Sequence, residues 1–101
     1  MSGYILGDDA VLDLEAIWDY IARDRIDAAD RWIAKLFETF EALGQNPGMG
    51  HKREDLTRLP ILFWPVGAYL VIYRAERGPL EILAVTQGSR DIPGLVNPRM
   101  H

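Results

Sequence analysis

The sequence predicts a small α+β fold of the order β-α-α-β-β-β, in which an antiparallel helical hairpin packs on a mainly antiparallel sheet. Two amphipathic stripes at helical spacing occupy residues 10–43. Three short β-branched and aromatic runs, separated by glycine-bearing turns, follow at residues 61–87. With 101 residues and no cysteine, the chain is expected to form one domain over residues 1–101, ending in a loosely ordered tail at 92–101.

The first two elements are a strand and a helix. The strand is expected over residues 2–7, where Tyr4 and Leu6 lie on one side of a strand period. Asp8 or Asp9 then offers a carboxylate as the helix N-cap. The apolar stripe of the helix consists of Ala10, Leu14, Ile17, Trp18 and Ile21. The carboxylates expected to face water are those of Asp13, Glu15 and Asp19.

The second helix has the strongest periodic signal in the chain. A break at residues 24–27 precedes it, and Asp27 is its expected N-cap. Its stripe consists of Ala29, Trp32, Ile33, Leu36, Phe37, Phe40 and Leu43, and Gly44 and Pro47 end it. Aromatic side chains on both stripes are expected in the core, so Phe37→Ala should cost about 3–5 kcal/mol.

A long loop and three strands complete the predicted fold. The loop at residues 46–60 holds the basic cluster of His51, Lys52, Arg53 and Arg58, and loops of this length are often functional. Strands are expected at 61–66, 69–75 and 80–87. Residues 69–73 are apolar on both faces, as in a central covered strand. Because proline has no N–H to donate to a sheet, Pro65 is expected at a strand end, at a bulge or on an edge strand. The adjacent Trp64 is expected either in the core or facing a partner.

The charge is unevenly distributed along the chain. The net charge is −4, with ten acidic and four basic residues in 1–44 and five acidic and seven basic residues in 45–101. The acidic total argues against tight nonspecific binding to nucleic acid. The sequence contains no membrane-length apolar run, no signal-peptide plan and no metal-ligand spacing, because its two histidines are fifty positions apart. A cytoplasmic protein without metal, cofactor or membrane partner is therefore expected.

Several short segments, in this order, resemble the RelE/ParE toxins of bacterial type II toxin–antitoxin systems. They are the N-terminal strand, Leu14 with residues 17–22, the positions Leu36, Phe40 and Leu43, then residues 46–50, 69–74 and 87–91. The resemblance implies the fold described above. It also implies a cognate antitoxin that carries a ribbon-helix-helix DNA-binding domain and wraps the toxin with its C-terminal segment. Contact with DNA would then be indirect, through the antitoxin.

The same resemblance leaves two targets open, since ParE-like members poison DNA gyrase and RelE-like members cleave mRNA on the ribosome. Arg90 falls on the arginine of the family's His-Gly-x-Arg-Asp pattern, but Gln87 replaces its histidine, and only two lysines are present. These departures favour a ParE-like toxin that inhibits gyrase by binding. The alternatives are a ribosome-dependent mRNA endoribonuclease and a non-toxic interaction protein that kept the fold.

The candidate target-binding residues are Lys52, Arg53, Arg58, Arg74 and Arg90. In a ribonuclease, the catalytic candidates would be Arg53, Arg74 and Arg90, because guanidinium groups bind phosphate through two parallel hydrogen bonds. Each has an ordinary structural alternative. Arg90 could pair with Asp91 or a helix acid, and Glu54 and Asp55 could neutralise the loop cluster. Arg74 could be solvated at an edge or lie beside Arg90 across neighbouring strands.

Overall fold

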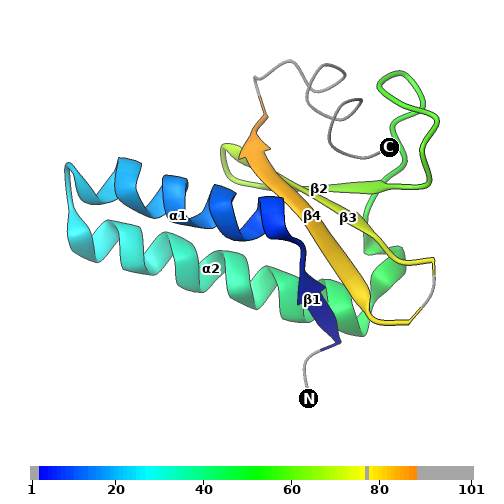
Figure 1. The fold of residues 1–101 in the computed structure, drawn as a ribbon, viewed down its shortest axis with the longest axis horizontal. Coiled ribbons are helices and arrows are strands. Elements are labelled where there is room, and N and C mark those ends of the chain that lie inside the picture. Colours follow the sequence, from blue (N-terminus) through cyan, green and yellow to red (C-terminus); the bar gives the residue numbers. More distant parts are fainter. Residues whose placement is uncertain (1–2, 77, 89–101) are drawn as a thin grey trace.

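The structure is a computed structural model that describes residues 3–76 and 78–88. Its elements are β1 (Tyr4–Leu6), α1 (Asp8–Ala22), α2 (Ile26–Gln45), the 3-10 helix η1 (Pro47–Met49), β2 (Leu62–Val66), β3 (Tyr69–Arg74) and β4 (Leu80–Gln87). The strands form one mixed sheet in the order β1-β4-β3-β2. Only the β1–β4 pairing in that sheet is parallel. The predicted α+β fold and its element order are therefore confirmed (Figure 1).

The helical hairpin covers one face of the sheet, and the main core lies between them (Figure 1). Leu36, Phe40 and Leu43 of α2 are fully buried there. They pack in one cluster with Val71 and Tyr73 of the central strand β3. The burial follows from the helical spacing of the apolar residues, which gathers them on one side of each helix.

The opposite face of the sheet carries a second, smaller core. Phe63, Ile72 and Ala84 are buried there, and Ile61, Leu56 and Leu59 from the preceding loop pack against them. β3 is thus apolar on both faces, which confirms its predicted central position. The loop that the sequence suggested as functional also serves as a cover for this face.

The helix starts differ from the predicted N-caps. The N-cap of α1 is Gly7, whose N–H donates to the carbonyl oxygen of Ile82 at 2.9 Å, so the helix begins directly where β1 ends. Asp8 and Asp9 lie in the first turn, where the helix dipole favours carboxylates. In α2 the N-cap is Arg25, and Asp27 lies in the first turn. Both N-cap predictions were therefore wrong by one or two positions.

Tyr73 ties the start of the loop to the sheet. Its side chain is fully buried, and its hydroxyl donates to the carbonyl oxygen of Pro47 at 2.7 Å and accepts from the N–H of Gly50 at 2.8 Å. Burial raises the pKa of this hydroxyl, and the Gly50 hydrogen bond opposes that shift. The end of α2 and η1 are thereby fixed beside β3.

β2 is an edge strand, which confirms one of the predicted settings for Pro65. Phe63 exchanges two backbone hydrogen bonds of 2.9 Å with His51, so its backbone faces away from β3. Pro65 is two residues further and faces the same way, where its missing N–H costs no ladder bond. The β2–β3 turn has Gly67 at φ +59°, and a Cβ there would lie 2.6 Å from Trp32.

Candidate functional site

An apolar groove lies on the helical hairpin, beside β1. Its lining residues are Leu6, Val11, Leu14, Glu15, Trp18, Ile33 and Phe37, and its volume is about 290 Å³. Val11 and Phe37 are 40% and 36% exposed, and Leu12 and Ile5 are exposed as well. Large apolar side chains that gather at a solvent-open groove are typical of a protein-interaction surface.

Two aromatic residues that the sequence assigned to the core belong to this groove. Phe37 is exposed and stacks edge-on against the buried Phe40, with ring centroids 5.6 Å apart. Trp18 is half-buried, and its Nε1–H donates to Asp30 at 2.9 Å, which fixes the indole across the two helices. The prediction of a core position was wrong for Phe37 and incomplete for Trp18. It is confirmed for Phe40, whereas Trp32 is half-buried and packs against Tyr69.

The cations of the basic loop differ in whether they are paired. Arg53 makes a two-pronged ion pair with Asp55, through Nε at 3.0 Å and Nη2 at 2.9 Å. The hydrogen bonds from Arg53 lower the pKa of the Asp55 carboxyl. Lys52 and Arg58 are exposed on the same loop. The charge of Arg53 is therefore partly neutralised within the loop, and Lys52 and Arg58 remain presented to solvent.

Of the two remaining candidate arginines, the structure describes only Arg74. Arg74 pairs across the sheet with Glu81, with Nη2 and Oε1 2.8 Å apart. That pair lies at the opposite end of the β3–β4 ladder from Gln87, where β4 ends. The possibility that Arg74 lies beside Arg90 is not tested by these contacts, because it depends on a residue outside the described part of the chain. Arg90 lies outside the described residues, as does the tail at 92–101.

His51 and Trp64 form a small aromatic surface beside the loop. Their rings stack with centroids 6.0 Å apart and an interplanar angle of 20°. Trp64 is half-buried and also packs against the main core, while His51 is exposed. The core reading of Trp64 is therefore confirmed in part, and a contact of its exposed portion with a partner stays a prediction.

A polar contact that the sequence did not predict joins α1 to β4. The Asp13 carboxylate accepts the backbone N–H of Val85 at 2.9 Å. β1 pairs with β4 only as far as Ile82. Asp13 therefore supplies the hydrogen-bond acceptor that a neighbouring strand would otherwise offer to Val85. Asp13 was expected to face water, and this contact corrects that expectation. No sequence signal reveals it, because 72 positions separate the two residues.

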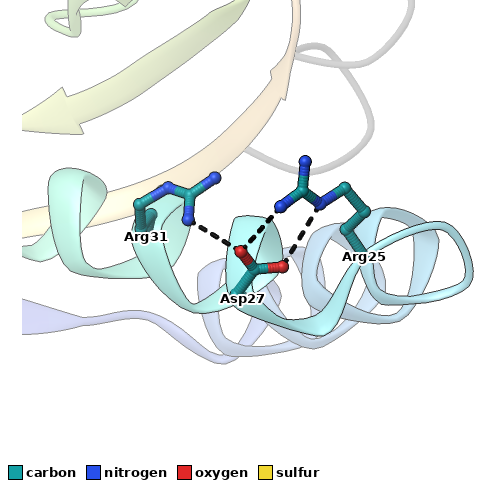
Figure 2. A network of polar contacts seen from close by, with 3 residues as sticks. All are labelled: Arg25, Asp27 and Arg31. Carbon is teal, nitrogen blue, oxygen red and sulfur yellow. Dashed lines mark hydrogen bonds and ion pairs between the residues drawn. The ribbon is translucent and has the colours of Figure 1, made fainter.

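The tip of the hairpin is held by exposed ion pairs (Figure 2). Asp27 accepts from Arg25 Nη2 and Arg31 Nη1, each at 3.0 Å. These hydrogen bonds lower the pKa of the Asp27 carboxyl, with that from Arg25 as the largest cause. Both arginines are thereby directed toward their own helix.

The described side chains contain no metal-type cluster, since no three His, Asp or Glu residues among them are grouped to hold an ion. Among the residues that the structure describes, no helix has both the length and the apolar character needed to cross a bilayer.

Comparison with known proteins identifies the class of the chain. A solved structure described as "Chromosomal ParDE TA system from P. aeruginosa" matches with a TM-score of 0.72 and 19% identity, over 86% of this chain and 96% of the other. No curated protein sequence matches. Residues 4–92 match the family described as "ParE toxin of type II toxin-antitoxin system, parDE". The chain belongs to this ParE toxin family, whose members pair with a ParD antitoxin.

Proposed function

We propose that this ParE toxin arrests growth by binding DNA gyrase, and that a cognate antitoxin neutralises it by placing a helix in the hairpin groove. The observation that carries the proposal is the contrast between an open apolar groove and the pairing of both described catalytic candidates, Arg53 in the loop and Arg74 on the sheet. Arg53 is bound to Asp55 and Arg74 to Glu81. A binding inhibitor requires complementary surfaces, and chemistry requires cations that are available to the transferring phosphate.

The sheet also supports a binding role. The face away from the helices carries Phe63, Ile72 and Ala84, which are covered by apolar side chains of the loop. A phosphate-binding face would need available cations on these strands, and Arg74, the cation that the described β3 carries, is paired with Glu81. The exposed loop cations, Lys52 and Arg58, are instead suited to an acidic surface of a protein target. Arg90 completes the proposed target-binding set together with Arg53 and Arg74.

The antitoxin half of the proposal rests on the groove. Its lining contains no basic residue and is apolar apart from Glu15. An amphipathic helix binds such a groove through anchors three or four residues apart. By family resemblance, the antitoxin would carry a ribbon-helix-helix domain and supply the contact with DNA.

The deciding experiment compares two purified reactions with the full chain. Inhibition of gyrase supercoiling, without mRNA cleavage in a ribosome-programmed assay, is the expected result. The double variant Lys52→Ala with Arg58→Ala should weaken that inhibition, whereas Lys35→Ala with Arg23→Ala, the same loss of charge on the hairpin, should not. Cleavage of mRNA with unchanged supercoiling would favour the ribonuclease alternative. Inactivity in both assays, with a stable antitoxin complex, would favour a non-toxic interaction protein.

A further inference from the structure

We infer that the hairpin groove selects a partner helix whose apolar stripe is flanked by lysine or arginine, so that the antitoxin segment of this toxin is cationic where it contacts the helices. The inference rests on the proposed antitoxin role of the groove and adds the charge of the partner. It depends on the size of the groove, the carboxylates along it, and the placement of the hairpin's cations.

The size of the groove fits apolar anchors from one helix. Its volume of about 290 Å³ is close to twice that of an apolar cavity of about 150 Å³ that holds a benzene ring. Leu14 and Trp18 lie four residues apart on one wall, and Ile33 and Phe37 four apart on the other. Positions four apart are neighbours on a helix surface, so the two walls run along the helices and present a lengthwise channel.

The walls of the channel carry carboxylates. α1 has no basic residue between Asp8 and Ala22, and of its five acidic residues Asp13 is engaged with β4 rather than with the groove. Glu15 lines the groove itself, and Asp19, four positions further, is also exposed. On α2, Asp30 lies one turn before the lining residue Ile33 and accepts from the Trp18 indole.

The hairpin's cations do not offset these carboxylates along the groove. Arg25 and Arg31 share Asp27 at the tip (Figure 2). Lys35 lies 5.3 Å from the ring centroid of Trp32, which also packs edge-on against Tyr69 on the sheet. Arg23 lies in the turn after α1. A basic-flanked helix thus finds complementary charge along the groove, and an acidic-flanked helix of the same apolar content is repelled.

Charge of this kind acts mainly on partner choice and association rate, because the carboxylates are exposed and screened by salt. Each exposed pair contributes little, but several along one helix add up to a preference of about tenfold at low salt. Affinity itself comes from burial of the apolar anchors. The apolar lining of the groove therefore provides the affinity, and the carboxylates of Glu15 and Asp19 select the partner by charge.

The test uses two synthetic helical peptides of about 18 residues, long enough to hold a helix when stapled. They share one leucine stripe and differ only in lysine or glutamate at the flanking positions. We expect the lysine peptide to bind the purified full chain about tenfold more tightly at low salt, and the preference to shrink as salt is raised. Titration followed by the intrinsic fluorescence of the chain's three tryptophans, of which Trp18 lines the groove, provides the measurement.

Variants separate the selection rule from the groove itself. Glu15→Lys with Asp19→Lys should reduce the preference at least fivefold, while Glu54→Lys, a charge reversal in the distant loop, should leave it unchanged. Phe37→Ala should weaken both peptides alike. Equal binding of both peptides, or tighter binding of the glutamate peptide, would overturn the charge rule and leave the groove standing. Failure of both peptides, or insensitivity of both to Phe37→Ala, would instead remove the groove from the proposed antitoxin role.

Discussion

Two apolar surfaces of this toxin differ in whether the chain itself covers them. The sheet face away from the helices is covered by the chain itself, because Leu56, Leu59 and Ile61 of the loop pack on it. The hairpin groove has the same apolar character, yet Val11 and Phe37 remain open to solvent. The covered sheet face stabilises the monomer, whereas the open groove is the surface that we propose for a partner.

The largest expected effect tests this difference within one aromatic pair. Phe40→Ala should destabilise the protein by about 3–5 kcal/mol, because Phe40 is fully buried. Phe37→Ala should cost under about 2 kcal/mol, because that ring is already 36% exposed. Urea unfolding monitored by circular dichroism measures both. A cost for Phe37→Ala equal to that for Phe40→Ala would mean that the groove is part of the monomer core.

The next effect concerns the anchor of the covering loop. Tyr73→Phe removes the hydroxyl that accepts from Gly50 and donates to Pro47. It should cost about 1–3 kcal/mol, since two partly buried backbone groups lose their partner. Tyr20→Phe is the control, because Tyr20 is 65% exposed and should change stability little. Equal unfolding midpoints for Tyr73→Phe and the parent protein would show that the loop is held by apolar contacts alone.

A smaller effect of opposite sign is expected on the sheet. Thr86 is 4% exposed, and its Oγ1 has no hydrogen-bond partner among the described residues. Thr86→Val keeps the shape and removes the desolvated hydroxyl, so it should stabilise the protein by about 1 kcal/mol. Thr57→Val should do the reverse, because Thr57 Oγ1 accepts the N–H of Leu59. Destabilisation by Thr86→Val in thermal unfolding would mean that the hydroxyl has a favourable contact in solution.

The smallest effect is expected at the hairpin tip. The pKa of Asp27 is lowered below 3.8 by its arginine partners, so their stabilisation is complete above that pH and is lost as pH falls through the lowered pKa. The melting temperatures of the parent protein and Asp27→Asn should therefore differ slightly at neutral pH and converge in acid. Asp24→Asn, in the adjacent turn, serves as the control. A difference that widened in acid would contradict this linkage.

The sequence predicted most of the fold because periodicity is a local property. The strands at 62–66, 69–74 and 80–87 and both helices lie within a few residues of their expected bounds. The N-cap of α1 was missed because β1 runs directly into α1, which moves Asp8 from the cap into the first turn. This connection depends on the backbone hydrogen bond between Gly7 and Ile82, which cannot be predicted from the local sequence because the two residues are far apart in the chain.

The candidate site was predicted less completely, for a related reason. The α2 stripe is wider than the face that the sheet can bury, so periodicity alone could not separate Phe40 from Phe37. Likewise, acidic neighbours suggested neutralisation of Arg53, which is confirmed, but the cross-strand partner of Arg74 depends on a register set by the whole sheet. Spacing therefore indicates which residues share a surface, and the packing of other elements decides whether that surface is open.

Pro65 and His51 have a consequence for solubility. An edge strand with unpaired backbone donors is a template on which further strands, from the same or another protein, add to give aggregates. Within Leu62–Val66, the backbone positions that face outward are Phe63, whose groups are bonded to His51, and Pro65, which has no N–H. The β2 margin therefore offers no outward amide donor to a newcomer. A further strand that approached this edge would find no free amide hydrogen at Phe63 or at Pro65, and this holds whether or not a partner occupies the groove.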